Sequence, residues 1–231
     1  MEADYYGTYT TFQGWHQPPD ASHDPFYQME TSDLGLKPGS KIIEIGFGQG
    51  RFLDFARRSN YDVRGLELIP DLVAQVRARG HVAEIGTRLS QFKAEADTFD
   101  LVVAIDVIEH LKLDQLVEFF EDAKVLLKTG GHILLRFPNG SSPFSMRIYN
   151  SDVTHRLHLN GGSLFQICEP LGLEVVRCGN PAVSVVGATA LRMKRKLQSM
   201  VRAFLEYLIG FAYFGLRESL DINLVAVLRK A

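Results

Sequence analysis

The chain has 231 residues, of which 46% are hydrophobic and 23% are charged, a balance typical of globular proteins and not of disordered or fibrous ones. The formal net charge of −2 gives no overall attraction to nucleic acid, so no nucleic-acid partner is expected. Cys168 and Cys178 are the two cysteines, and their spacing argues against a zinc module and a disulfide scaffold.

Short apolar runs alternate with amphipathic stretches along most of the chain. Strands are expected at residues 41–45, 62–68, 81–85, 99–105, 132–137, 172–178 and 222–230. Helices are expected at residues 51–59, 70–80 and 113–128, the last of them closed by Gly130 and Gly131. This alternation predicts an α/β fold with a seven-stranded, mostly parallel sheet and helices on both faces. Residues 222–230 are placed as the last strand, with an antiparallel orientation as the working hypothesis.

Three segments stand outside this alternation within the single domain expected over residues 1–231. Residues 1–35 form an aromatic leader, which suggests a flap packed over another part of the protein. Its aromatic residues are Tyr5, Tyr6, Tyr9, Phe12, Trp15, Phe26 and Tyr27. Residues 138–162 are polar and follow a strand, and residues 183–220 form a helical insertion before the last strand.

A glycine-rich turn follows the first expected strand. Glu44, Gly46, Gly48 and Gly50 have the spacing E-x-G-x-G-x-G, where glycines permit positive φ and let a ligand approach the backbone. A dinucleotide fingerprint would need glycine at Arg51, and a phosphate loop would need a Gly-Lys-Ser/Thr ending. The turn therefore suits a nucleoside whose other end carries a cation, although a simple tight turn is the alternative.

An acidic residue ends the second expected strand. Glu67 comes about 20 residues after Gly46, the offset at which a carboxylate meets a ribose in nucleotide-binding units. Because a carboxylate only accepts hydrogen bonds, it can receive both ribose hydroxyls. Leu68 is expected to lie against an adenine face, and the alternative is that Glu67 is a solvated charge at the end of a strand.

These residues, together with the block FDLVVAIDVIEHL, resemble the class I S-adenosylmethionine-dependent methyltransferases over about residues 40–180 and the last strand. The resemblance implies a Rossmann-like fold with S-adenosylmethionine as cofactor. It further implies that the glycine loop contacts the methionine part, that Glu67 contacts the ribose and that Asp106 lines the donor pocket. Many relatives hold the adenine with an acidic or amide residue after the third strand, whereas Thr87 or a backbone carbonyl is the candidate here.

The polar stretch after the fifth expected strand is the candidate acceptor region, and it contains Asn139, Asp152, His155 and His158. The D-x-T-H segment resembles one in bacterial methyltransferases of surface-polysaccharide gene clusters. We hypothesise that His155 is a general base and that Asp152 orients it or contacts the acceptor. Two alternatives stay open: these side chains bond loop backbone groups, or both histidines join Asp152 as metal ligands, although no metal is assigned.

Two further features near this region carry predictions. By its position in the family, His110 could approach the reacting centre, and the alternative is that it bonds backbone where a helix starts. Ser163 and Gln166 form a plausible capping box for the next helix.

The late insertion combines basic and apolar residues. Arg192, Lys194, Arg195, Lys196 and Arg202 precede and enter an apolar run at 205–216. A basic helix followed by an apolar one could place the 190–217 segment on an anionic membrane, and a lid or dimer helix pair is the alternative. No apolar stretch reaches the ~20 residues that a membrane span needs, so a cytoplasmic protein is expected, with peripheral membrane contact as an option.

The function expected from these observations is S-adenosylmethionine-dependent O-methylation of a sugar or another small-molecule hydroxyl, in polysaccharide biosynthesis. The acceptor would be a small molecule or a glycan. The alternatives are methylation of a quinone or lipid intermediate and a catalytically silent donor-binding scaffold. The glycine spacing disfavours a dehydrogenase. The sequence does not indicate an oligomeric state.

Overall fold

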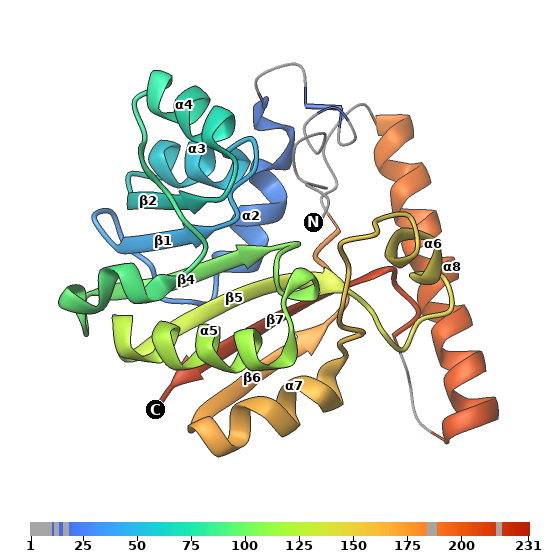
Figure 1. Ribbon diagram of the computed structural model, residues 1–231. Helices are drawn as coiled ribbons and strands as arrows, with labels where there is room; N and C mark the ends of the chain where they lie inside the picture. The colour runs from blue at the N-terminus through green and yellow to red at the C-terminus, as the bar shows by residue number, and fades with distance from the viewer. Residues whose placement is uncertain (1–10, 12–13, 16–18, 184–188, 216–218) are drawn as a thin grey trace.

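The computed structural model describes residues 11, 14–15, 19–183, 189–215 and 219–231 (Figure 1). The strands form a seven-stranded sheet in the order β3-β2-β1-β4-β5-β7-β6, in which β7 runs antiparallel to both of its neighbours. The strands are β1 (Lys41–Ile45), β2 (Asp62–Glu67), β3 (Val82–Ile85), β4 (Phe99–Ile105), β5 (Leu127–Pro138), β6 (Leu173–Gly179) and β7 (Asn223–Lys230). The predicted fold class is confirmed.

The strand order reverses between β1 and β4, which pair in parallel with Ile45 opposite Ala104. From β1 the chain continues outward through β2 and β3, whereas β4 continues to β5 on the other side. Such a switch point opens a crevice at the carboxyl ends of the strands, because the two connections leave in opposite directions. The glycine loop after β1 and Asp106 after β4 therefore leave the sheet at the same edge.

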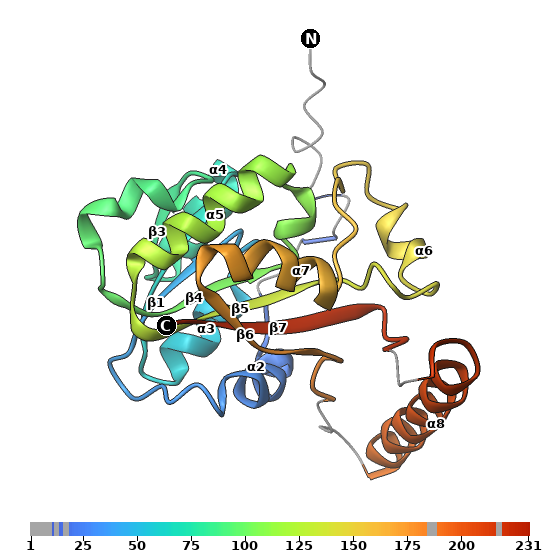
Figure 2. The same ribbon diagram turned by 90° about the horizontal axis from the view of Figure 1, so that it is seen from below.

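Helices cover both faces of the sheet (Figures 1 and 2). One face carries α2 (Asp24–Thr31), α3 (Arg51–Arg58) and α4 (Pro70–Ala78), and the other carries α5 (Leu113–Leu126), α7 (Gly161–Cys168) and the 3₁₀ segment η2 (Leu89–Glu95). The shorter helices are η1 (Ala21–His23), η3 (Ile108–His110), α6 (Met146–Tyr149) and η4 (Glu169–Leu171). Side chains alternate along a strand, so Ile42 joins the core of the first face and Ile43 that of the second.

Most boundaries agree with the sequence prediction within one or two residues, and two places differ for a physical reason. Helix α5 ends at Leu126, and Gly130 and Gly131 lie inside β5 because Leu127 already pairs with Phe99 of β4. Helix α7 begins two residues before the expected Ser163, because the Asn160 side chain accepts from the Ser163 backbone N–H at 2.8 Å. Pairing with β4 in the first place, and the Asn160 side-chain cap in the second, outweighs the preference of the local glycines for a turn.

The aromatic leader is partly helical. Phe26 and Tyr27 belong to α2, and Tyr27 is buried against Phe52 and Phe55, with ring centroids 5.3 and 5.5 Å apart. Trp15 lies over the glycine loop, as described below. The remaining leader aromatics, Tyr5, Tyr6, Tyr9 and Phe12, lie outside the described residues.

The late insertion forms one continuous helix, α8 (Thr189–Phe214), where the sequence predicted a basic helix followed by an apolar one. No proline or glycine interrupts it before Gly210, so the backbone hydrogen bonds continue through the change of composition. Figure 2 shows α8 standing beside the sheet and not on either of its faces. In the described part of the chain, no helix is both long enough and apolar enough to cross a membrane.

Candidate active site

The glycine loop turns the chain from β1 into α3. Gly46, Gly48 and Gly50 have φ values of +63°, +52° and +78°, a region that L side chains rarely adopt. A Cβ on Gly48 would lie 2.7 Å from the Trp15 ring, and one on Gly46 would overlap Val107. Glycine is therefore required for both the turn and the close approach.

Glu67 ties the end of β2 to this loop. One of its carboxylate oxygens accepts from the Gly48 N–H at 2.9 Å, and the other accepts from the N–H groups of Leu68 and Ile69 at 2.7 and 3.1 Å. The side chain faces the cavity described below, and Oε2, which accepts from the Gly48 N–H, has further acceptor capacity for a hydroxyl. Glu67 therefore shapes the loop as well as lining the pocket.

Glu44 lies beneath the loop and is buried. Its Oε2 has no hydrogen-bond partner among the described residues. Burial and then the nearby charge of Glu67 raise the pKa of the Glu44 carboxyl well above its usual range, against one backbone hydrogen bond from Leu53. Because an unpaired buried carboxylate is costly, the arrangement favours a cationic ligand.

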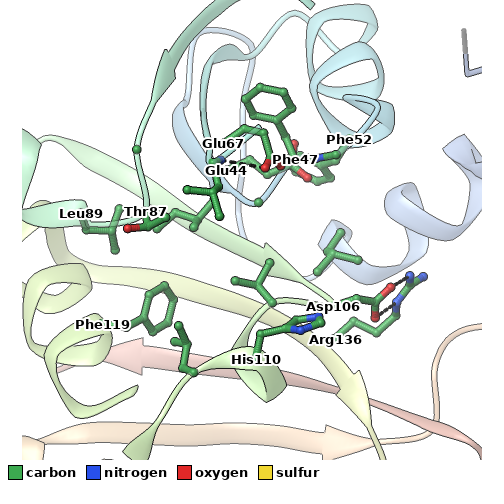
Figure 3. A pocket seen from close by; sticks show the side chains of 18 of the residues that line it. Glu44, Phe47, Phe52, Glu67, Thr87, Leu89, Asp106, His110, Phe119 and Arg136 are labelled. Atoms are coloured by element: carbon green, nitrogen blue, oxygen red, sulfur yellow. Dashed lines mark hydrogen bonds and ion pairs between the residues drawn. The ribbon is translucent and has the colours of Figure 1, made fainter. Parts of the chain in front are cut away.

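A cavity of about 610 Å³ opens at this edge of the sheet (Figure 3). Glu44, the glycine loop and Glu67 form one side, which we call the donor half, with Leu68 at its rim. Thr87, which follows β3, also lines the cavity, as expected from the sequence. The volume falls in the range of small-molecule sites, and acidic groups at two points suit a ligand that carries both a ribose and a cation.

Asp106 enters the cavity at the end of β4. Its backbone has φ of +56°, and its carboxylate forms a bidentate ion pair with Arg136 of β5, with Nε 2.9 Å from Oδ1 (Figure 3). Arg136 also lies over the Phe26 ring at 5.8 Å. The sequence analysis missed Arg136, although a single charge in the apolar strand HILLRFP was a usable signal.

His110 lines the cavity opposite the donor half and is held by two successive hydrogen bonds. Its Nδ1 lies 2.8 Å from Thr154 Oγ1, and Thr154 donates its hydroxyl proton to Asp152. Burial, followed by the nearby His155, lowers the pKa of His110 and favours its neutral form. Burial opposes ionisation of Asp152, but hydrogen bonds from Thr154 lower its pKa overall. Asp152 therefore orients His110 through Thr154, whereas the sequence hypothesis paired it with His155.

His155 lies behind His110 and does not line the cavity. The two rings are 4.7 Å apart, and His155 Nε2 is 4.0 Å from Glu109 Oε1. Burial, then the charge of Asp106, raises the pKa of the Glu109 carboxyl well above its usual range. We call Glu109, His110, Asp152, Thr154 and His155 the acceptor half.

The metal alternative considered from the sequence combined Asp152, His155 and His158. Instead, His158 stacks on Tyr149 at 3.5 Å, and Asp152 bonds Thr154. The structure brings Glu109 to the two histidines His110 and His155, and one ligand atom from each lies within 4.8 Å of the others. Glu109 was missed because nothing in its local pattern distinguishes it from an exposed helix-start acid.

A family model described as a methyltransferase domain matches residues 22–177, more than half of the chain. The chain belongs to this methyltransferase family, and its fold is that of the class I S-adenosylmethionine-dependent enzymes. A solved S-adenosylmethionine-dependent methyltransferase from Archaeoglobus fulgidus superposes with a TM-score of 0.66 at 16% identity, covering 98% of this chain and 100% of that one. The predicted class and the cofactor, S-adenosylmethionine, are confirmed.

Curated relatives match part of their own length. The probable fatty acid methyltransferase Rv3720 of Mycobacterium tuberculosis is 28% identical over 160 residues, which is 65% of this chain and 38% of the relative. A probable S-adenosylmethionine-dependent methyltransferase of Mycolicibacterium smegmatis is 31% identical over 138 residues, which is 59% of this chain and 53% of the relative. The chain thus spans about half or less of these relatives.

Proposed function

We propose that this protein methylates a hydroxyl group of a sugar or another small molecule, with a surface-polysaccharide precursor as the glycan candidate. The observation that carries the proposal is that one cavity joins the donor half to His110. In this proposal Glu44 neutralises the amino group of the donor, Glu67 binds its ribose and Leu68 packs on its adenine, while the glycine loop and Asp106 enclose the methionine part. S-adenosylmethionine supplies a methyl group on a positively charged sulfur, and transfer leaves the carbon–sulfur electron pair on that sulfur.

The acceptor half supplies the proton acceptor in this proposal. Because Thr154 fixes the proton of His110 on Nδ1, Nε2 is left as the basic nitrogen. An acceptor hydroxyl in the cavity would give its proton to His110 Nε2 as its oxygen bonds to the methyl carbon. Asp152 and His155 act as positioning residues, Asp152 through Thr154 and His155 by packing on the His110 ring.

A labelled methyl donor with a panel of nucleotide sugars, glycans and quinol analogues tests this proposal. We expect a labelled O-methyl product, and we expect His110→Gln to lower turnover by about 100- to 10,000-fold with unchanged donor affinity. His132→Gln, outside the cavity on β5, is the matched control and should keep turnover. A protein that binds the donor and labels no acceptor in the panel would instead be a silent scaffold.

The second candidate acceptor is a lipid or quinone intermediate, and helix α8 favours it. Exposed apolar side chains recur every three or four residues along one face of α8: Met193, Leu197, Met200, Val201, Phe204, Leu208 and Phe211. The curated relative named as a fatty acid methyltransferase is consistent with an apolar acceptor.

The charges on α8 suit an anionic surface. Its one acidic residue, Glu206, is buried and accepts from the Asn180 side chain at 2.7 Å and the Leu220 N–H at 3.2 Å. Lys194 and Lys196 are exposed near the apolar face and can reach lipid headgroups while that face enters the interface. The proposal is that α8 gives peripheral contact with an anionic membrane.

Co-sedimentation with phosphatidylglycerol vesicles tests this contact. Lysines near an anionic surface contribute about 1 kcal/mol each, so Lys194→Glu with Lys196→Glu should weaken binding at least 30-fold, about 2 kcal/mol in free energy. Lys37→Glu with Lys41→Glu is the charge-matched control and should bind as the wild type does. A dimer that dissociates in Phe204→Glu, with no vesicle binding by the wild type, would assign the face to a second copy.

Two further expectations remain proposals. The seven strands belong to one sheet, which supports a single methyltransferase domain over residues 1–231. The free thiols of Cys168 and Cys178 are consistent with a reducing compartment and hence with a cytoplasmic location.

A further inference from the structure

Two histidines of the acceptor half have their tautomers set by their neighbours. His155 Nδ1 lies 3.1 Å from the backbone carbonyl of Tyr149. A carbonyl only accepts, so Nδ1 carries the proton, and in the neutral ring Nε2 carries a lone pair. His155 Nε2 faces Glu109 Oε1 at 4.0 Å, which is beyond hydrogen-bond distance.

The same logic applies to His110. The Thr154 hydroxyl gives its proton to the Asp152 carboxylate, so its oxygen accepts from His110 Nδ1–H at 2.8 Å. The neutral ring of His110 therefore also carries its lone pair on Nε2. Outer hydrogen bonds of this kind orient histidines that bind metal ions, because they hold the tautomer and the ring plane.

Glu109 is the third side chain of this cluster, beside His110 and His155. The side chains of Glu109 and His155 are only 2% and 6% exposed, and Glu109 Oε2 has no hydrogen-bond partner among the described residues. The backbone carbonyl of Glu109 accepts from Arg156 N–H at 2.7 Å and Leu157 N–H at 3.1 Å, which holds the His155 loop against it. Glu109 thus presents a buried carboxyl oxygen, unpartnered among the described residues, beside the two imidazole rings, an arrangement that a bound cation would stabilise.

We infer that Glu109, His110 and His155 bind a divalent first-row transition-metal ion through a carboxylate oxygen and two Nε2 atoms. Two imidazoles and one carboxylate suit such ions and leave coordination positions open. One possible ligand atom from each of the three side chains lies within 4.8 Å of the others. Side-chain rotations that move these atoms by about 1 Å would bring the three residues to bonding distance near 2.1 Å. Of the three residues His110 lines the cavity, so the ion would lie where His110 separates the cavity from Glu109 and His155.

The consequence for catalysis rests on the proposed function, whereas the ion binding does not. An acceptor hydroxyl bound to the ion is acidified and loses its proton to solvent. Its oxygen then bonds to the methyl carbon as the carbon–sulfur bond breaks and the electron pair stays on sulfur. In the metal-bound protein the ion thus replaces His110 Nε2 as the activating group.

Mn²⁺ titration of the chelator-treated full chain, followed by electron paramagnetic resonance of the free ion, tests the site. We expect one Mn²⁺ per chain. Glu109→Gln should weaken binding at least 100-fold, and Thr154→Val, which removes the hydroxyl that links His110 to Asp152, should weaken it about 10- to 100-fold. His158→Asn, in the same loop but stacked on Tyr149, is the control and should bind Mn²⁺ within twofold of the wild type.

Calorimetry with S-adenosylhomocysteine separates this inference from the proposed function and reports that each variant is folded. A wild type that binds the nucleoside but no Mn²⁺ overturns the metal site alone, as does equal Mn²⁺ affinity in the wild type, Glu109→Gln and Thr154→Val. If Glu109→Gln does not fold, Thr154→Val decides the matter. A wild type that binds Mn²⁺ but no nucleoside overturns the proposed function and leaves the metal site standing.

Discussion

The donor half of the cavity and the acceptor half, which lines the cavity through His110, are built in different ways. The donor half comes from one stretch of chain, residues 44–69, in which β1, the glycine loop and the end of β2 follow one another. The acceptor half joins residues that are far apart in sequence, such as His110 and Thr154, which are separated by 44 positions. One half is a local turn, and the other is a junction of two loops.

This difference affects how each half is held. Backbone N–H groups of Gly48, Leu68 and Ile69 hold Glu67, and those groups stay in place as long as the loop is folded. The acceptor half depends on side-chain relays and on two backbone bonds to the carbonyl of Glu109. We therefore expect changes in the donor half to alter binding, and changes in the acceptor half to alter turnover and stability.

The largest effect is expected at the centre of the donor half. Glu67→Ala removes the ribose acceptor and the ties to three N–H groups, and hydrogen bonds to a charged group contribute about 1.5–3 kcal/mol each. Calorimetry should show affinity for S-adenosylmethionine reduced by about 100-fold or more. Glu84→Ala, an exposed carboxylate on the adjacent β3, should bind normally. Unchanged affinity in Glu67→Ala would contradict the donor assignment.

The next effect concerns Asn139, which anchors the polar loop of residues 138–162. The buried Asn139 side chain donates to the carbonyls of Ser219 and Asp221, both at 3.1 Å, and accepts from the Ser141 N–H. Asn139→Ala should cost about 2 kcal/mol, lowering Tm by about 4–8 °C in thermal unfolding. Turnover should fall more than donor affinity does. Equal losses of both would show that the two halves are not independent.

A pH-dependent effect is expected at Glu44. Burial raises its pKa in the folded state above the unfolded value, so the folded protein binds that proton more tightly and loses stability as pH rises through this interval. Glu44→Gln lacks this dependence and should be more stable at about pH 8 than the wild type, by about 1–2 kcal/mol. The difference in Tm should widen from about pH 5 to pH 8 and shrink when S-adenosylmethionine is bound. A constant difference would argue against an uncompensated carboxylate.

The smallest effect is expected at the start of α7. Asn160→Ala removes the cap on the Ser163 N–H and a bond to the Ser141 hydroxyl at 2.9 Å. Loss of such a cap costs about 1 kcal/mol, so Tm should fall by about 2–4 °C. Gln166→Ala is the matched control, because the structure gives the cap to Asn160, and it should leave Tm nearly unchanged. Equal shifts in the two variants would restore the capping box expected from the sequence.

The sequence by itself determined where the strands and helices lie and which residues form the donor half, whereas the antiparallel direction of the last strand follows from its pairing with β5 and β6. Strand and helix periodicity are local properties, and a loop that needs positive φ can be recognised from its own glycines. The spacing from Gly46 to Glu67 could be read for the same reason, since one strand–helix–strand unit sets it.

Only the tertiary structure decided the acceptor half, the partner of Asp106 and the continuity of α8. Arg136 reaches Asp106 because β4 and β5 are neighbours in the sheet, which no local pattern records. The relay from Asp152 to His110 and the approach of Glu109 to His155 depend on where a long loop returns. Such contacts form between residues that are far apart in the sequence. They stabilise the protein only once folding has brought those residues together, so no local sequence pattern predicts them.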